Sequence, residues 1–545
     1  MSGVGKSITF PGLTGNNSID GILTNRAWGG TITYAFPAQF SDYGNYPASS
    51  FPYESSGFQS APASIRTAAK FILEGTDQAS VGFSLEGFTN APVQLGVASS
   101  STVRYGLTAL NVSGYDAYAS GPSNSARAGD VWLKASSHQN AVAGNKAWFD
   151  VIHETGHAIG LKHPNETGYG TPVMNSATDA MEHTVMSYKG YPGAAANFTN
   201  EAWGYAQTFM RSDIAALQKM YGADFTTNAG STVYKWNPGS GVTLVNGSPA
   251  ISPGVNKIFA TIWDGGGTDK YDLSSYSTNL TVDLRPGEWS SFGTSQNAIL
   301  GPGRTAQGTI YNAYLYNNDN RSLIEDAVGG SGSDEIIGNQ TRNFLQGLSG
   351  NDTLIGEGDA DRLSGGNGND LLNGGTGADQ LDGGAGIDTA TYNFAGSGVT
   401  ASLYAGQGTA GEAAGDTYVG IENLQGSRYA DLLVGDLNVN TLWGGLGNDR
   451  LNGAAGNDVM VGGAGDDTFV FGAGVTGRDV ITDFNTGNTE DRIDLRGNEL
   501  LFDWLAVLLN TYQVGANVEI RSADGDVIVI NNASLSAIDQ GDFIF

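Results

Sequence analysis

The sequence predicts an α+β domain followed by an all-β domain of stacked short strands, and three observations lead to this prediction. The chain has 545 residues, too many for a single hydrophobic core, so two or more domains are expected. Three of its 5 histidines fall within residues 153–163, directly after a run with the apolar spacing of a helix. Many of its 81 glycines recur every nine residues from residue 329 onward, which is typical of repeated structural units.

The histidine-rich segment has the spacing of a metal site. Residues 151–164 read V-I-H-E-T-G-H-A-I-G-L-K-H-P. Residues four apart lie on one face of a helix, so the imidazoles of His153 and His157 can aim at one point. Gly160 lets the chain leave the helix, because glycine takes positive φ at little cost. The reversal can return His163 to the same metal as a third ligand.

This set of ligands points to catalysis. Three neutral histidines leave a tetrahedral zinc ion with one open position, which is typical of catalytic zinc. Glu154 follows the first ligand and points past the metal, where it can take a proton from a zinc-bound water and later pass it to a leaving amine. Surface histidines on an ordinary helix, or a closed structural metal site, are the alternatives. His138 and His183 carry no such spacing and are interpreted as non-catalytic.

A second segment, residues 184–188, reads T-V-M-S-Y. With the histidine motif it resembles the zinc motif and Met-turn of the metzincin metalloproteases, and the tyrosine two residues after the methionine points to the serralysin branch. The resemblance implies that Met186 forms an apolar floor beneath the zinc histidines. It also implies that Tyr188 is a zinc ligand at rest and a catalytic residue that swings away to stabilise the oxyanion, a role open to a phenol donor.

Composition excludes several functions. The formal charge of −29, with only 26 Lys+Arg, argues against a nucleic-acid partner. The absence of cysteine excludes disulfides, thiolate nucleophiles and cysteine-ligated zinc. No secretory leader is recognisable at the N-terminus, and the longest apolar stretch, residues 500–509, is too short for a transmembrane segment.

Nine-residue units fill residues 329–391 and 426–470. Every unit begins with glycine; the sixth position is Asp except at Asn343 and Asn440, and the eighth is large and apolar except at Ala390. This pattern is similar to the G-G-x-G-x-D-x-U-x repeat of RTX proteins, which form a calcium-binding parallel β-roll. The alternative, a low-complexity linker, needs no regularly placed apolar residue.

Carboxylates at the sixth position and glycine carbonyls suit calcium, which prefers six to eight oxygen ligands. Neighbouring turns would complete each site, so we expect the arrays to be disordered until calcium reaches roughly millimolar concentration. The two asparagines predict fewer calcium ions than turns. The predicted ligands are Asp334, Asp352, Asp361, Asp370, Asp379, Asp388, Asp431, Asp449, Asp458 and Asp467.

The nine-residue register is interrupted between the two arrays. Each array is preceded by a strand-rich lead-in and a short I-E-[DN] sequence. This shared order indicates that the whole module was duplicated; the alternative is coincidence among Gly/Asp-rich segments. We therefore expect a candidate pro-segment at 1–19, a zinc metalloprotease catalytic domain at 20–223, lead-ins at 224–328 and 392–425, RTX arrays at 329–391 and 426–470, and a C-terminal β-rich segment at 471–545.

Within the first domain, local patterns predict a helix at 64–74, strands at 103–107 and 131–135, and a closing helix at 201–221. The resemblance to serralysins suggests a substrate-binding edge strand near 129–133. It implies an α+β metzincin catalytic domain, with a mixed sheet packed on helices, followed by an all-β parallel β-roll and β-sandwich calcium-binding domain.

The C-terminal segments 479–487 and 491–495 resemble those of serralysins, and the final G-D-F-I-F resembles their type I secretion signal, although these residues can equally finish a β-sandwich. The resemblance implies a secreted, extracellular zinc metalloendopeptidase of Gram-negative bacterial origin and a monomer. The resemblance further implies that the protein acts on proteins or peptides and holds one catalytic Zn²⁺ and several structural Ca²⁺. The implied partners are a type I exporter and, as a further candidate, a proteinaceous inhibitor. The rival is a non-catalytic RTX adhesin or surface-layer protein with a vestigial zinc domain.

Overall fold

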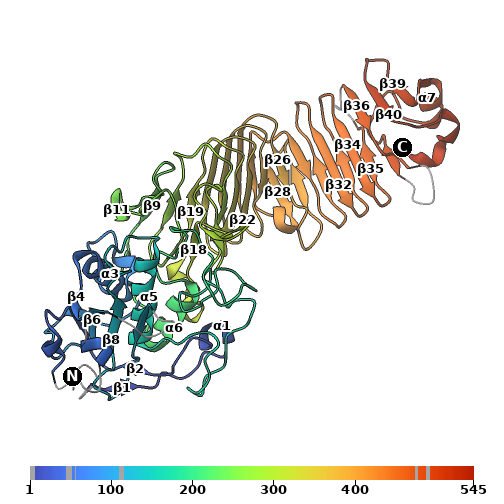
Figure 1. Ribbon diagram of the computed structural model, residues 1–545. Coiled ribbons are helices and arrows are strands. Elements are labelled where there is room, and N and C mark those ends of the chain that lie inside the picture. Colours follow the sequence, from blue (N-terminus) through green and yellow to red (C-terminus); the bar gives the residue numbers. More distant parts are fainter. Residues whose placement is uncertain (1–5, 45–51, 56, 110–115, 473–476, 486–490) are drawn as a thin grey trace. The chain divides into compact units, whose positions relative to one another are not determined.

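The computed structural model describes residues 6–44, 52–55, 57–109, 116–472, 477–485 and 491–545. These residues form two compact units, the first comprising Met1–Ser275 and Thr281–Ile324, the second Tyr276–Leu280 and Glu325–Phe545. The main helices belong to the first unit, and the second unit consists largely of parallel strands (Figure 1). Residues 1–5 of the candidate pro-segment and 486–487 of the C-terminal resemblance lie outside the described residues.

A mixed sheet organises the first part of unit 1. Its strand order is β5 (Val93–Leu95), β3 (Ile32–Ala35), β6 (Val103–Thr108), β8 (Asp130–Lys134) and β7 (Ala117–Ala119), and β4 (Gln59–Ser60) also pairs with β6. The pairs β3–β5, β3–β6 and β6–β8 are parallel, whereas β7 runs antiparallel to β8. The strands predicted at 103–107 and 131–135 are therefore confirmed.

The predicted edge strand at 129–133 is wrong. This segment falls on β8, which has β6 on one side and β7 on the other. A strand paired on both sides and covered on both faces reads as a continuous apolar run, as V-W-L does at 131–133. The edge of the sheet is β7 instead.

Helix α5 (Lys146–Ile159) packs against this sheet and against α3 (Ala63–Leu73), which confirms the helix predicted at 64–74. Asn145 caps the start of α5 by accepting a hydrogen bond from the backbone N–H of Trp148 at 2.9 Å. The helix ends at Gly160, whose φ of 121° favours glycine.

The closing helix is shorter than predicted: α6 spans Arg211–Tyr221 rather than residues 201–221. Its predicted apolar face, which includes Ile214 and Leu217, is buried. The preceding residues are not helical because their backbone N–H groups bond elsewhere. That of Tyr205 donates to Gly144 at 3.1 Å, and that of Gln207 donates to Phe259 at 2.8 Å.

The rest of unit 1 is strand-rich. One group of strands has the order β11 (Ser248–Ile251), β10 (Thr243–Val245), β9 (Val233–Trp236) and β13 (Lys270–Asp272). A second has the order β12 (Ala260–Ile262), β18 (Ile310–Asn312) and β15 (Trp289–Ser290). Their core is aromatic, with Tyr234, Trp236, Trp263, Tyr271 and Tyr311 fully buried.

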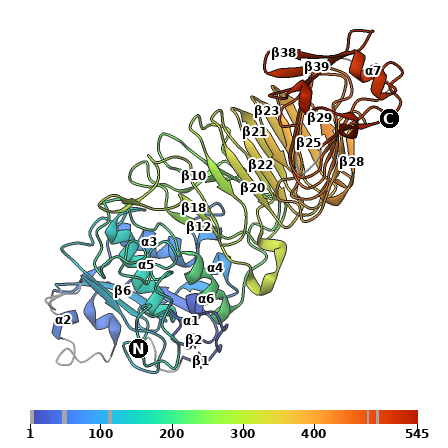
Figure 2. The ribbon, with the colours of Figure 1, turned by 90° about the vertical axis from the view of Figure 1, so that its right-hand side faces the viewer.

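In unit 2, successive nine-residue units enter opposite sheets, so residue i pairs with residue i+18. In the first array one sheet holds β19 (Asp326–Val328), β21 (Phe344–Ser349), β23 (Arg362–Asn367) and β25 (Gln380–Ala385), and the other holds β20 (Glu335–Asn339), β22 (Thr353–Glu357), β24 (Leu371–Asn373) and β26 (Thr389–Thr391). Figure 2 labels strands of both sheets, β21, β23 and β25 of the first and β20 and β22 of the second. The predicted inward apolar residue is confirmed, since Leu354 and Leu363 are fully buried.

The second array repeats this arrangement with β30 (Asn423–Gln425), β32 (Thr441–Leu446), β34 (Val459–Ala464) and β36 (Arg478–Ile481) in one sheet, and β31 (Leu432–Val434), β33 (Arg450–Asn452), β35 (Thr468–Val470) and β37 (Arg492–Asp494) in the other. Between the arrays lie β27 (Thr400–Ser402), β28 (Gln407–Ala410) and β29 (Thr417–Val419).

The C-terminal segment adds α7 (Trp504–Leu509), the antiparallel strands β38 (Thr511–Val514), β39 (Asn517–Arg521) and β40 (Val527–Ile530), and β41 (Phe543–Ile544). Among the described residues of both units, no helix is long and apolar enough to cross a membrane.

Candidate functional site

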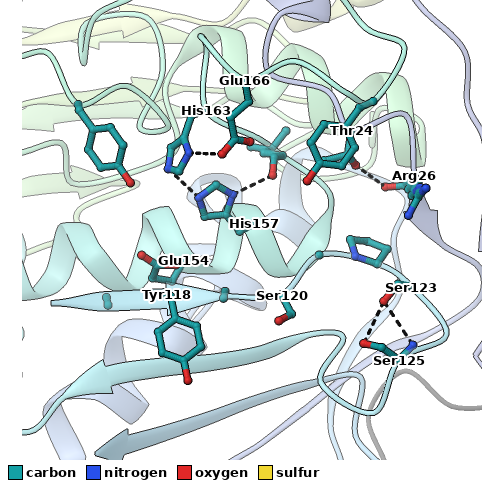
Figure 3. Close-up of a pocket in the computed structure, with 17 residues that line it drawn as sticks. Thr24, Arg26, Tyr118, Ser120, Ser123, Ser125, Glu154, His157, His163 and Glu166 are labelled. Carbon is teal, nitrogen blue, oxygen red and sulfur yellow. Dashed lines mark hydrogen bonds and ion pairs between the residues drawn. The ribbon is translucent and has the colours of Figure 1, made fainter. Parts of the chain in front are cut away.

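Three imidazoles converge at the C-terminal end of α5. The Nε2 atom of His163 lies 3.1 Å from Nε2 of His153 and 3.0 Å from Nε2 of His157. The sharp exit at Gly160 makes this possible, and a Cβ there would lie 2.4 Å from the carbonyl oxygen of Arg26. Figure 3 shows His157 and His163 on one cavity with Glu154.

The contacts of the three Nδ1 atoms determine which ring nitrogen of each imidazole carries the proton. Nδ1 of His153 faces the Val185 carbonyl at 2.7 Å, and Nδ1 of His157 faces the Leu161 carbonyl at 3.0 Å. Nδ1 of His163 faces the Glu166 carboxylate at 2.7 Å. Each Nδ1 faces an acceptor and so carries a proton, which leaves three Nε2 lone pairs pointing at one another.

Such a cluster of lone pairs fits a metal ion. Tetrahedral zinc with Zn–N bonds of about 2.0–2.1 Å separates its nitrogen ligands by roughly 3.3 Å, close to the spacing observed. Among the described residues, these three histidines are the one group of three or more His, Cys, Asp or Glu side chains whose ligand atoms all lie within 4.8 Å of one another. Burial, reinforced by neighbouring histidines, lowers the pKa of His153 well below its usual value and that of His157 to about 4, so the rings stay neutral.

Glu154 lies beside this cluster with an unused acceptor. Its side chain is buried, and among the described residues Oε2 has no hydrogen-bond partner. Burial, with a smaller contribution from Asp150, raises the pKa of Glu154 well above its usual value. A buried carboxylate oxygen without a donor is costly unless it serves a ligand or a reaction, so Glu154 is poised to accept a proton.

The 184–188 segment lies directly against the histidines. The ring of Tyr188 is 4.6 Å from the His163 ring and 5.5 Å from the His153 ring, and 37% of the residue is exposed. Met186 is fully buried beneath α5, where a Cβ on Gly156 would come within 2.6 Å of its sulfur. The structure therefore places both residues beside the histidine cluster.

Two aspartates that the sequence did not single out hold this segment. Asp213, at the start of α6, accepts hydrogen bonds from the Thr184 hydroxyl at 2.5 Å and the Val185 N–H at 2.8 Å, and burial raises its pKa to about 7. Asp179 binds both neighbours of Tyr188, accepting from the Ser187 hydroxyl at 2.7 Å and from Lys189 Nζ at 2.6 Å. No short motif marks either aspartate.

Two pockets meet at Glu154, His163 and Tyr188, and the edge strand β7 contributes Ala117 to both. The first pocket extends past Tyr118 and Ser120 towards Arg26, as Figure 3 shows. The second extends in the other direction, and its lining includes Asp116, Lys146, Phe149, Asp150, Asn197 and Phe198. An extended chain beside β7 would therefore pass the histidines with side chains entering both pockets.

In unit 2 the repeat aspartates are stacked in rows. Except in Asp334 and Asp431, Oδ1 accepts the backbone N–H of the residue 18 positions earlier, as when Asp352 accepts from Asp334 at 2.7 Å and Asp370 accepts from Asp352 at 2.8 Å. The other oxygen, Oδ2, is buried and has no hydrogen-bond partner among the described residues. This holds for Asp352, Asp361, Asp370, Asp379, Asp388, Asp449, Asp458 and Asp467.

These unpartnered oxygens fit calcium. A Cβ on Gly365 would lie 2.2 Å from Asp370 Oδ2, so only glycine leaves the backbone room beside the carboxylate. Burial raises the pKa of Asp361 to about 8 and that of Asp449 to about 7. Packed carboxylate oxygens without donors are the chemistry that a hard cation with oxygen ligands satisfies.

The first aspartate of each array differs from the others. Asp334 accepts backbone N–H groups at both oxygens, from Leu280 at 2.9 Å and Gly330 at 2.7 Å. Asp431 likewise accepts from Val399 and Ser427, at 2.6 and 2.5 Å. Neither therefore offers the unpartnered oxygen that the others share.

The rows continue beyond the nine-residue units, which sequence reasoning missed. Asp416 accepts from the Asp379 N–H at 2.9 Å, Asp479 from Asp458 at 3.0 Å, and Asp491 from Asp467 at 2.9 Å. A signal was present, because each of the three precedes an apolar residue two positions on, as the repeat aspartates do.

A further acidic pair in unit 1 was also missed. Asp264 and Asp269 are both buried; Asp264 accepts from the Tyr234 hydroxyl at 2.8 Å and Asp269 from the Thr232 N–H at 2.7 Å. Burial raises the pKa of both carboxyls, and in Asp269 the neighbouring Asp264 adds to the rise. The D-G-G-G-T-D spacing, residues 264–269, was interpreted only as the start of a duplicated module.

Comparison with known proteins agrees with these features. Residues 223–521 match the family described as Peptidase M10 serralysin C terminal. Metalloprotease AprA of Pseudomonas entomophila (strain L48) is 34% identical over 210 residues, which cover 37% of this chain and 39% of that protein. Serralysin of Proteus mirabilis is 30% identical over 333 residues, covering 58% and 60%. Serralysin C of Dickeya chrysanthemi is 33% identical over 234 residues, covering 41% and 43%.

The chain thus spans between 39% and 60% of the length of these relatives. Among solved structures, the extracellular lipase LipA from Serratia marcescens aligns with a TM-score of 0.17 and 16% identity, over 43% of this chain and 44% of that one. A score this low does not indicate a shared fold.

Proposed function

Because this chain belongs to the serralysin family of metalloproteases, we propose that it is a secreted zinc-dependent endopeptidase that hydrolyses peptide bonds in proteins. The observation that carries the proposal is the convergence of three Nε2 lone pairs beside the unpartnered oxygen of Glu154. Residues 20–223 would be the metzincin catalytic domain, with the zinc ion held by His153, His157 and His163.

Zinc, when bound, would polarise the attacking water and the substrate carbonyl. Glu154 would take the proton of that water on its Oε2 atom and hand it to the amine that leaves. Burial raises the pKa of Glu154 well above its usual value, which makes this carboxylate a better proton acceptor than an exposed one. Glu166 would keep His163 in the tautomer that presents Nε2 to the metal.

Tyr188 would be both a zinc ligand at rest and the donor to the carbonyl oxygen on which negative charge develops. Its ring lies against His163, and its neighbours are anchored by Asp179. The proposed donor role of Tyr188 can be tested by removing its hydroxyl group.

Tyr188→Phe is expected to lower kcat by about 10²-fold, the usual loss when one oxyanion donor is removed, with KM changed little. Steady-state kinetics on one peptide, with bound zinc measured in parallel, checks this. Tyr404→Phe, which removes a hydroxyl from an exposed residue of unit 2, is the matched control. Unchanged kcat in Tyr188→Phe would exclude the proposed donor.

For unit 2 we propose a structural role in which several calcium ions occupy the rows of unpartnered aspartate oxygens. Asp334 and Asp431 would contribute less than the other repeat aspartates, since backbone N–H groups already occupy both of their oxygens. Export by a type I system through the C-terminal segment 471–545 stays part of the proposal.

Cleavage of casein by the refolded protein tests the proposed activity. Release of soluble peptides should require calcium and stop when a zinc chelator is added. The rival function, an adhesin with a vestigial zinc domain, predicts bound zinc without any cleavage. The buried, unpartnered oxygen of Glu154 favours the enzyme. Burying a carboxylate oxygen without a donor costs free energy, and we expect a site without catalytic function to have lost such a residue.

A further inference from the structure

The second pocket beside Glu154 contains a fixed cation. Lys146, the first residue of α5, lines this pocket together with Glu154 and Tyr188. Its Nζ donates to both carboxylate oxygens of Asp150, at 2.6 and 2.7 Å, and lies 5.5 Å from the centre of the Phe198 ring. The side chain is nonetheless 40% exposed, so the ammonium is held in place while one side of it stays open to the pocket.

Asp150 has a second partner besides Lys146. Its carboxylate lies 3.0 Å from Nε2 of His138, and Nδ1 of the same ring lies 3.0 Å from the Lys134 carbonyl. The Ser137 hydroxyl, also 3.0 Å from Nδ1, can accept as well. His138 is thus held at both ring nitrogens by oxygen atoms of neighbouring residues. The Asp150 carboxylate is therefore shared between His138 and Lys146, while one side of the Lys146 ammonium stays open to the pocket.

Two other acids of this pocket, Asp116 and Glu166, are paired with neighbouring residues. Asp116 accepts from Lys134 at 2.9 Å, and Glu166 is bound to His163 at 2.7 Å. Among the described residues that line the pocket, Lys146 is the only lysine or arginine. The ammonium of Lys146 therefore lies in the pocket that Glu154 and Tyr188 also line.

We propose that Lys146 makes this pocket a subsite for an acidic side chain, Asp or Glu, at a position adjacent to the scissile bond. The proposal rests on the proposed endopeptidase function and names the substrate class of that same site. The open side of the ammonium would pair with the substrate carboxylate, and Phe198 would shield the pair from water on one side. A basic side chain would instead meet the ammonium of Lys146.

The test compares matched peptides that differ only in Glu, Gln or Lys at the residues flanking the cleaved bond. The wild-type protein should show a kcat/KM about fivefold to tenfold higher for Glu than for Gln, as expected for a partly buried ion pair, and lowest for Lys. Lys146→Met should bring the Glu and Gln peptides to equal rates. Lys70→Met, at an exposed position on α3, should leave the preference intact.

Two further measurements separate recognition from structural damage. Lys146→Glu should favour the Lys peptide over the Glu peptide, a reversal that loss of packing cannot produce. In the wild-type protein, the Glu/Gln ratio should fall as ionic strength rises, because salt screens the pairing.

A wild-type protein that cleaves Gln and Glu peptides equally, or a Lys146→Met variant that keeps the preference, overturns the inference while the protease function stands. A protein that holds zinc and calcium and cleaves no peptide overturns the function and the inference with it.

Discussion

Glu154→Gln is expected to lower kcat for peptide hydrolysis by about 10²–10⁴-fold, the range that general acid–base catalysis contributes, while zinc content stays unchanged. Glutamine has the shape of glutamate but cannot take the proton that the unpartnered Oε2 atom is placed to accept. The three histidines keep their Nδ1 hydrogen bonds in the variant, so the metal site itself should survive. Initial rates and zinc content, measured on the same preparations, check both parts.

Glu288→Gln makes the same chemical change at an exposed residue of unit 1 and should leave kcat unaltered. Both variants are compared at matched zinc and calcium concentrations. If Glu154→Gln hydrolyses the peptide as fast as the wild-type protein, the assigned proton acceptor is wrong.

Removal of calcium is expected to unfold the arrays of unit 2, and return of about millimolar calcium to refold them. Without the ion, each row keeps buried carboxylate oxygens that lack any donor and repel their neighbours. Far-ultraviolet circular dichroism of the full chain should lose β signal in a calcium chelator, and limited proteolysis should then cut within residues 329–470. Magnesium should not substitute, because it prefers strict octahedral geometry.

Asp370→Asn should raise the calcium concentration needed for refolding, because it weakens a ligand whose Oδ2 atom is free. Asp524→Asn, at an exposed position of the same unit, is the control. Identical spectra with and without calcium would refute the proposed role of the arrays.

The calcium-free arrays should also become less stable as pH rises. Burial raises the folded-state pKa of Asp370 to about 6 and of Asp361 to about 8, above the value of about 3.9 for an unfolded aspartate. A carboxyl whose pKa rises on folding favours the folded state at low pH and loses that contribution as pH passes through the folded pKa. Chemical denaturation in chelator should therefore show stability falling between about pH 4 and pH 8.

Local sequence spacing was sufficient to predict that the three histidines lie together beside Glu154. The four-residue separation of His153 and His157, and the turn at Gly160, depend only on helix geometry and on glycine φ. The structure adds what depends on tertiary pairing. That β7 rather than β8 is the edge strand follows from strand order. Asp179 binds Ser187 and Lys189, the neighbours of Tyr188, through loop contacts that sequence spacing does not predict.

The nine-residue arrays likewise combine features that local sequence predicts with features that depend on tertiary structure. A nine-residue period was enough to predict parallel strands with an inward apolar residue, because every unit repeats the same local geometry. The rows of aspartates nevertheless continue through Asp416, which follows the antiparallel insertion of β28. The insertion changes the spacing along the chain while preserving the stacking in space, so a fixed period cannot find this residue.

The most direct test of the metal site is to restore zinc to the chelator-treated protein in saturating calcium, following bound zinc and peptide hydrolysis together. Activity and bound zinc should rise in parallel and level off at about one ion per chain, as expected for one site with three histidine ligands. His163→Ala should abolish both. Full hydrolysis by the metal-free protein, or zinc binding that survives His163→Ala unchanged, would contradict the assignment of His153, His157 and His163 as the catalytic metal site.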